Sequence, residues 1–257
     1  MKIKQLIPLT IACAAALLAF HHGSASATQA RAEEILRKVD DMWRGKSSRA
    51  GIVMKVKTAN YTRTLSLDAW SKGKEMTLVR IVSPLKEKGT ATLKTGNEIY
   101  TYLPKTDRTI KLSSGMMMGS WMGSHFTNDD LVKESRLTDD YDTTITFEGT
   151  RQGKNMMEFT LIPKPDAAVV WGKIILLLYV DGDDYVPVKE EYFDEDGAPV
   201  RTMAFSDVKI FSGRKIPAIL RVTPVGKPGE FTELIYGSLD FNLDINDSFF
   251  SLSQLRR

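Results

Sequence analysis

The sequence predicts a mainly β protein with one strongly curved antiparallel sheet. From residue 52 onward, apolar and polar residues alternate with a period of two, as Ile52, Met54 and Val56 do. Turn signals rich in Gly, Asn, Asp and Pro separate about ten or eleven such segments, and no strand–helix–strand rhythm appears. Because no linker-like stretch divides residues 28–257, we expect them to form a single domain.

A helix is predicted over residues 28–45, before the first strand. Ile35, Leu36, Val39 and Trp43 recur there at helical spacing, and Gly45 fits the C-terminal end. Strands are predicted at residues 52–56, 65–68, 76–82, 99–103, 143–148, 156–162, 173–180, 186–193, 200–211, 216–223 and 231–243. Residues 90–94 follow a basic link and precede a tight turn, residues 109–112 lead into an apolar loop, and a last helical turn is predicted around residues 249–252.

Some predicted strands are apolar on both faces, most clearly residues 174–178. A sheet with one face in water should alternate, so we expect both faces of this strand to be covered. A curved wall with a concave side lined for a ligand or a helix fits this pattern, and so does a sandwich of two packed layers.

Residues 1–27 have the layout of a secretory signal peptide. Lys2 and Lys4 precede an apolar run over residues 6–20, and Ala25-Ser26-Ala27 follows as a cleavage site. We therefore expect export, a mature N-terminus at Thr28, and a soluble mature chain. The only cysteine, Cys13, lies inside this segment, so the alternative is a lipid anchor at Cys13.

Composition argues against nucleic-acid binding and against catalysis. Removing residues 1–27 removes two lysines and no acidic residue, which lowers the net charge from +3 to +1. His125 is the only histidine beyond residue 27, and Ser120 is one place early for a nucleophile elbow. Residues 181–184 and 194–197 are acidic but suit hairpin turns better than calcium loops. We expect no enzyme activity, no metal and no cofactor.

The stretch over residues 112–131 is the most unusual part of the sequence. It places large apolar side chains among glycines, although surface loops are normally polar: Met116, Met117, Met118, Trp121, Met122 and Phe126. Thr127 and Asp130 have the spacing of a capping box for a short helix ending near Glu134. The stretch is either folded into the core or a lid over a lipid-binding cavity, and we favour the lid.

Further candidate site residues are aromatic or basic. Trp43 on the first helix is a candidate ligand contact. Arg63 and Arg80 share strand faces with apolar residues, so each either contacts a ligand or reaches water at a rim. A second set lies in two links that antiparallel folding could bring to one end: Lys86, Lys88, Lys105, Arg108 and Lys111. These side chains either solubilise the links or dock onto anionic head groups or an acidic partner.

Several stretches together resemble the LolA-like family of outer-membrane lipoprotein-sorting proteins. They are residues 41–50 (DMWRGKSSRA), Ser83-Pro84 with residues 86–91 (KEKGTA), residues 102–105 (YLPK) with 107–109 (DRT), and residues 116–131. The resemblance covers nearly all of residues 28–257. It implies an unclosed antiparallel β-barrel with helices at its mouth and an apolar cavity for acyl chains.

The resemblance also implies a place and a role. It predicts a periplasmic carrier for acylated lipoproteins or lipids that moves them toward the outer membrane. Expected partners are an inner-membrane exporter and an outer-membrane acceptor, with transient membrane contact and a monomeric chain. The alternative is a lipid-sensing or envelope-stress binding module of the same fold that transfers nothing.

Overall fold

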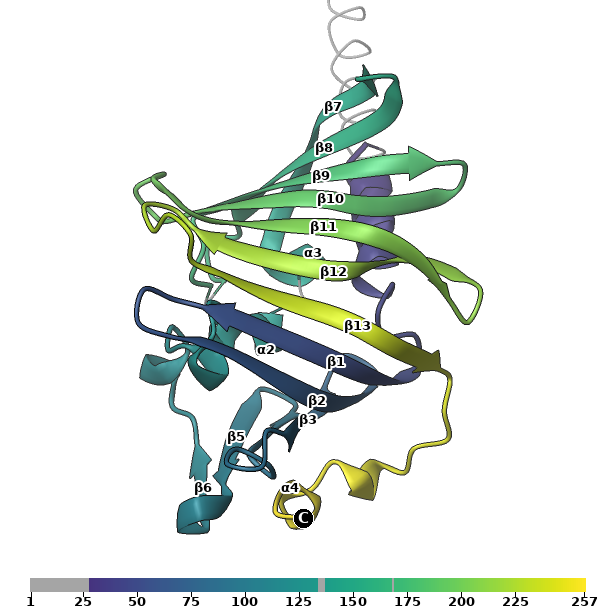
Figure 1. Cartoon of the computed structure of the whole chain (residues 1–257). Helices are drawn as coiled ribbons and strands as arrows, with labels where there is room; N and C mark the ends of the chain where they lie inside the picture. Colours follow the sequence, from purple (N-terminus) through teal and green to yellow (C-terminus); the bar gives the residue numbers. More distant parts are fainter. Residues whose placement is uncertain (1–27, 134–136, 168) are drawn as a thin grey trace, which may run out of the picture.

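The computed structural model describes residues 28–133, 137–167 and 169–257, and these residues form one antiparallel 13-stranded sheet (Figure 1). The strands are β1 (Ser47–Lys57), β2 (Thr62–Lys72), β3 (Met76–Ser83), β4 (Ala91–Thr95), β5 (Glu98–Leu103), β6 (Arg108–Lys111), β7 (Tyr141–Arg151), β8 (Lys154–Pro163), β9 (Lys173–Asp181), β10 (Asp184–Phe193), β11 (Pro199–Phe211), β12 (Arg214–Pro224) and β13 (Phe231–Phe241). The curved antiparallel sheet is therefore confirmed, the sandwich is not formed, and the strands outnumber the ten or eleven expected.

The helical segments are short apart from the N-terminal helix. That helix occupies residues 28–40 of the described chain and continues as turns to Gly45. The others are η1 (Pro104–Thr106), η2 (Ser114–Met116), η3 (Trp121–Gly123), α2 (Asn128–Lys133), α3 (Leu137–Asp140), η4 (Asp247–Phe249) and α4 (Leu252–Leu255). The predicted capping box is confirmed, because the Thr127 amide donates to Asp130 Oδ2 and the Asp130 amide to Thr127 Oγ1. Glu134, its predicted end, lies outside the described residues, as do residues 1–27 with Cys13.

The strand order explains how the sheet is assembled. It runs β6-β5-β4-β3-β2-β1-β13-β12-β11-β10-β9-β8-β7, so two meanders meet where β1 pairs with β13. β6 and β7 lie at the two ends of this order, which leaves the barrel unclosed. The stretch between these two edge strands, residues 112–140, carries the apolar loop, α2 and α3. This stretch crosses from one edge of the sheet to the other.

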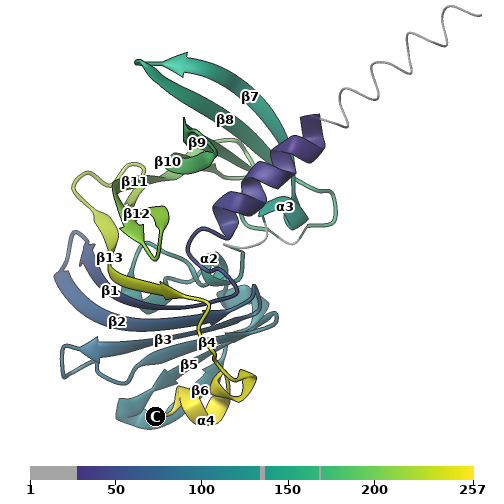
Figure 2. The same cartoon turned by 90° about the vertical axis from the view of Figure 1, so that its right-hand side faces the viewer.

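The main core lies on the concave side, where the N-terminal helix packs against the sheet (Figure 2). Ile35 and Leu36 of the helix are buried together with Met54, Leu65 and Phe159 of three strands. Each of these side chains contributes about 1.5–3 kcal/mol when it leaves water. The helix therefore fills part of the hollow that the curved sheet forms.

The strand with residues 174–178 is covered more on one face than on the other. Ile174, Leu176 and Leu178 are buried in the main core, whereas Ile175 and Leu177 are half-buried on the outer face. Both faces of this strand are therefore covered, the inner face completely and the outer face in part. Buried and half-buried residues therefore alternate along this strand, as expected for a curved wall with one fully packed face.

The C-terminal segment covers the outer face of the other meander. Phe250 and Leu255 are buried against Leu78 of β3 and Leu93 of β4. Val79 and Thr92, next to these two strand residues, point to the concave side, since alternate strand residues face opposite ways.

No helix among the described residues is long and apolar enough to cross a membrane.

Candidate functional site

A cavity of about 200 Å³ lies on the concave side of the sheet, between the N-terminal helix and the loop over residues 112–131. Its walls are mainly aliphatic and aromatic. They come from four parts of the chain: Val39 and Trp43 from the helix, Ile52, Leu67 and Val79 from β1 to β3, Ile174, Met203, Leu220 and Leu234 from the second meander, and Trp121, Phe126 and Leu131 from the loop region. Such a lining suits an apolar ligand.

The loop closes the cavity with two of its six large apolar residues. Trp121 is 5% exposed and Phe126 is 7% exposed, and both belong to the main core. The indole Nε1 of Trp121 donates to Thr92 Oγ1 of β4 at 3.1 Å, which fixes the ring against the sheet. Trp121 and Phe126 therefore line the cavity and also belong to the hydrophobic core.

The four methionines of the loop divide into two kinds. Met116 and Met118 are 43% and 54% exposed and do not line the cavity. Met117 packs against the small cluster of Ile99 and Leu112, and Met122 packs against the main core. The six large apolar residues, predicted as one set, therefore lie in three environments: the surface, the small cluster and the main core.

Arg63 holds the loop from β2. Its guanidinium donates to the carbonyl of Met122 at 2.7 Å and pairs with Glu87 at 3.2 Å. Gly123 follows with a φ of +65°, and a Cβ there would lie 3.3 Å from the Tyr61 hydroxyl, so glycine suits this close approach. Arg63 of β2 thus binds the backbone of the loop at Met122.

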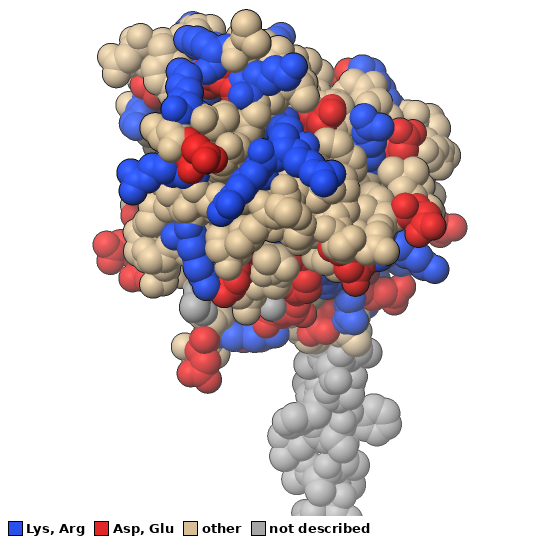
Figure 3. All heavy atoms as spheres, turned by 90° about the horizontal axis from the view of Figure 1, so that it is seen from below, with Lys and Arg blue, Asp and Glu red and all other residues tan. Residues whose placement is uncertain are grey.

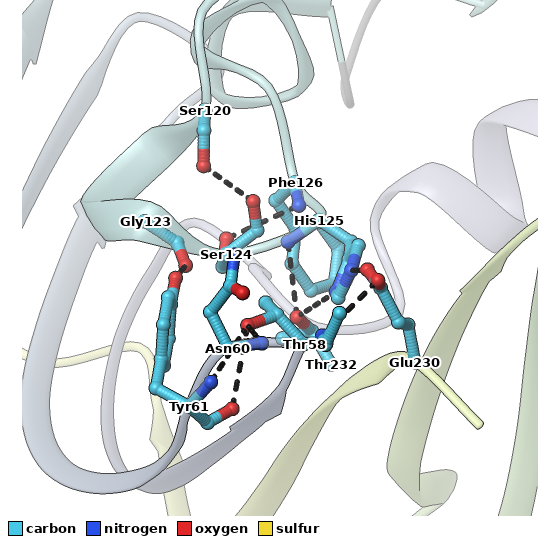
Figure 4. A network of polar contacts seen from close by, with 11 residues as sticks. Thr58, Asn60, Tyr61, Ser120, Gly123, Ser124, His125, Phe126, Glu230 and Thr232 are labelled. Atoms are coloured by element: carbon cyan, nitrogen blue, oxygen red, sulfur yellow. Dashed lines mark hydrogen bonds and ion pairs between the residues drawn. The ribbon is translucent and has the colours of Figure 1, made fainter. Parts of the chain in front are cut away.

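Polar contacts tie the tip of the loop to the sheet (Figure 4). The side chain of His125 bonds Thr232 Oγ1 through Nδ1 at 2.8 Å and Glu230 Oε2 through Nε2 at 3.1 Å. The Tyr61 hydroxyl donates to the carbonyl of Gly123. The His125 hydrogen bond is the main cause that lowers the pKa of Glu230. His125 therefore anchors the loop on β13.

A buried ion pair, which sequence reasoning missed, attaches α2 to the sheet wall. The guanidinium of Arg201 on β11 is 4% exposed and donates to both carboxylate oxygens of Asp130, at 2.5 and 2.7 Å. It also lies over the rings of Trp171 and Tyr192, 4.4 and 4.2 Å from their centroids. Burial lowers the pKa of Arg201, but the Asp130 carboxylate outweighs it and the pKa is raised. Alternation along β11 places Arg201 inward, and that is the only sequence signal for it.

Arg80 lies on the opposite face from the cavity. Its guanidinium donates to the carbonyl of Gln254 in α4, and burial lowers its pKa. Arg80 thus holds the C-terminal segment and does not line the cavity, although its strand carries Thr77 and Val79 on the cavity side.

The end of the cavity beside the N-terminal helix is polar. Ser48 of β1 and Ser71 of β2 are register partners, and their hydroxyls lie 2.7 Å apart. Asp40 is 6% exposed, and its Oδ2 has no hydrogen-bond partner among the described residues; the same holds for the indole Nε1 of Trp43. Burial is the main cause that raises the pKa of Asp40 to about 8. Sequence reasoning named Trp43 but not Asp40, which looks like an ordinary helix-end residue.

The five basic candidates lie toward the end of the molecule that carries β4 to β6. A Cβ on Gly89 would lie 3.5 Å from Pro104 Cγ, so the link of Lys86 and Lys88 adjoins the link of Lys105. Figure 3 shows Lys and Arg side chains gathered on the face seen from below. All five candidates are exposed (Lys86, Lys88, Lys105, Arg108 and Lys111), and Lys111 pairs with Glu98. The structure therefore brings the two links together.

A second hollow, of about 430 Å³, lies beside the C-terminal segment. It is lined by Trp70, Leu243, Ile245 and Phe249 and is widely open to solvent. None of the predicted site residues lines it, so we place the candidate site in the less open cavity on the concave side. The described residues also contain no group of three or more His, Cys, Asp or Glu side chains arranged to hold a metal ion.

The fold is similar to three solved structures. A DUF1329 family protein from Desulfovibrio piger has a TM-score of 0.77 and 20% identity, covering 89% of this chain and 99% of that one. A structure described as an outer membrane lipoprotein-sorting protein domain from Vibrio parahaemolyticus has a TM-score of 0.73 and 23% identity, covering 89% and 100%. A LolA superfamily protein from Nitrosomonas europaea has a TM-score of 0.71 and 21% identity, covering 87% and 98%.

Sequence comparison adds a family. Among curated proteins, none matches the chain significantly. A family model whose description reads "-like: Uncharacterized protein" matches residues 73–257, which is well over half of the chain. The chain therefore belongs to this family and has the LolA-like fold that its sequence predicts.

Proposed function

We propose that this protein is a periplasmic carrier that shields the acyl chains of lipoproteins or lipids inside the concave cavity and transfers them toward the outer membrane. The partly open, mainly apolar cavity lined by Trp121 and Phe126 is the observation that carries the proposal. Solved structures of similar fold include one described as an outer membrane lipoprotein-sorting protein domain, which supports the same reading.

The energetics of lipid transfer favour an enclosed cavity. A 16-carbon chain costs on the order of 12 kcal/mol to expose to water, at ~0.8 kcal/mol per methylene. An acylated molecule therefore needs a nearly complete apolar cover to cross an aqueous gap. The aliphatic and aromatic walls from four parts of the chain supply such a cover.

The size of the cavity implies that cargo enters by moving the loop region. Its volume of about 200 Å³ is below the ~300–1,000 Å³ of typical ligand pockets. The elements over the cavity are short, and polar contacts from Arg63, His125 and Arg201 fasten them. Such contacts can break and reform, so we propose that residues 112–131 act as the lid and that Trp121, Met122 and Phe126 contact cargo.

Location and partners complete the proposal. Residues 1–27 are the export signal and residues 28–257 the lipid-binding domain. Leu85, which is 86% exposed, stands next to Lys86 in the link between β3 and β4. An apolar tip beside Lys86 and Lys88 suits brief contact with an anionic membrane surface or with an acidic exporter or acceptor. Lys105, Arg108 and Lys111 extend this basic face.

Lipid capture and transfer test the proposal. Native mass spectrometry of the mature chain, purified from the periplasm without detergent, should find bound lipid or acylated peptide. Donor vesicles with a fluorescent phospholipid, together with unlabelled acceptor vesicles, should exchange lipid faster in its presence. Capture without transfer would favour a sensing module. No bound lipid and no uptake of added lipid would contradict both functions.

A further inference from the structure

Polar residues interrupt the apolar lining of the cavity, among them Arg44, Asp130 and Glu190. Ser48, Ser71 and Thr77 line one end and lie side by side across β1, β2 and β3, because Ser71 pairs in register with both of the others. Asp40, at the end of the N-terminal helix, and Trp43, in the following turns, also line the cavity, and the chain passes from them directly into β1 at Ser47. Apolar and aromatic residues form most of the remaining wall.

Two groups at the polar end lack hydrogen-bond partners among the described residues: the Asp40 carboxyl oxygen Oδ2 and the indole N–H of Trp43. A buried polar group without a partner costs about 1–3 kcal/mol. Asp40 is the last residue of the helix and Trp43 lies in the turns that follow it, and both line the cavity. An unpaired acceptor and an unpaired donor therefore border the same apolar space.

The charges around Asp40 oppose one another, so they leave the site without a strong preference for an ion. Arg44 and Lys74 act on Asp40 as cations, whereas Glu190 and Asp41 act as anions. Burial outweighs all four and raises the pKa of Asp40 to about 8, which keeps its carboxyl largely neutral at pH 7. A charged head group would lose its own hydration here without one clear counter-ion.

From these observations, and on the basis of the carrier function proposed above, we propose that Asp40 and Trp43 form a subsite for an uncharged hydroxyl group on the cargo. A hydroxyl both donates and accepts, so one group can pair with the Asp40 carboxyl and the Trp43 N–H together. The preferred cargo then carries an alcohol at the end that enters toward β1 and β2, with its apolar body against the remaining wall.

Binding of two matched probes tests the subsite. 1-Decanol and 1-chlorodecane have the same chain and differ in the terminal hydroxyl. Their affinities would be measured on the full mature chain by the change in tryptophan fluorescence. A net hydrogen bond between neutral groups corresponds to about a twofold to tenfold change in affinity. We expect D40L and W43F each to weaken decanol binding by that factor and to leave chlorodecane binding unchanged.

Control variants separate the subsite from a general effect on folding. D40N keeps a group that donates and accepts, so it should retain most of the decanol affinity. D196L removes an exposed carboxyl that does not line the cavity and should change neither probe. Thermal melting of each variant would confirm that it is folded at the titration temperature. If D40L is unfolded at that temperature, the test rests on W43F, which removes only the N–H and keeps an aromatic ring.

The possible outcomes are distinct. Unchanged decanol binding in folded D40L and W43F would overturn the subsite and leave the carrier function standing. Tighter binding of decylamine or decanoate than of decanol to the wild-type chain would also overturn it, because the subsite would then favour an ion. Failure of the wild-type chain to bind any of these probes would overturn the subsite and contradict the carrier function as well.

Discussion

Replacing Trp121 by alanine should destabilise the empty protein strongly, because this loop residue is also part of the core. The ring is 5% exposed and packs in the main core. Truncating a buried aromatic residue to alanine costs about 3–5 kcal/mol, and the lost hydrogen bond to Thr92 is part of that effect. We expect a loss of about 4 kcal/mol in the free energy of unfolding.

Met118→Ala is the matched control from the same loop. Its side chain is 54% exposed and outside the cavity, so the free energy of unfolding should change by no more than about 0.5 kcal/mol. In urea, with a slope of ~2–3 kcal/mol per molar, W121A should lower the midpoint by roughly 1.5–2 M. Equal midpoints for W121A and the wild-type chain would refute the reasoning and make the loop separable from the fold.

Three further predictions concern charges. D130N should cost about 3–5 kcal/mol because it leaves the Arg201 guanidinium buried without its carboxylate, and a denaturation midpoint equal to wild type would contradict this. The Asp40 pKa of about 8 lies above its unfolded value, so the stability that Asp40 contributes is complete below about pH 4 and is lost as pH rises toward 8. The melting temperature of D40N should therefore fall less with rising pH across this window than that of the wild-type chain. An equal fall in both proteins would refute the assignment. Changing Lys86 and Lys88 to glutamine should weaken binding to anionic vesicles by about 2 kcal/mol without lowering the melting temperature. The control is the same change at Lys55 and Lys57, the two exposed lysines of β1. An equal loss of vesicle binding in the control would contradict a special role for the link of Lys86 and Lys88.

The fold could be predicted from the sequence because its signals are local. Alternation at Ile52, Met54 and Val56 reflects burial of one face of β1, and the spacing of Ile35, Leu36 and Val39 reflects the one helix face that packs inward. Counting the strands was harder, since short strands such as β6 carry too few residues for a clear period. The helix α3 also went unpredicted, and its four residues show no periodicity.

The site could be predicted only in part, because its key contacts join distant residues. Composition identified the loop, yet it could not tell the buried Trp121 from the exposed Met118, since Gly119 between them lets the chain turn either way. Arg201 pairs with Asp130 across 71 positions, and no local pattern encodes that partner. The raised pKa of Asp40 results from its burial, and the burial of a single side chain can be seen only in the folded structure.

The pairing between β12 and β13 differs from the other long ladders of the sheet. Along these two strands, residues 219–222 pair with residues 232–235, whereas β11 and β12 pair along nearly their whole length. Figure 1 shows the two strands diverging with distance from the hairpin that joins them. A short ladder resists bending less than a long one, so we expect the sheet to bend most easily between β12 and β13, inside the second meander. Opening between these two strands would widen the cavity without unfolding either part of the sheet, and hydrogen exchange at the β12–β13 amides should accelerate when a long-chain lipid enters.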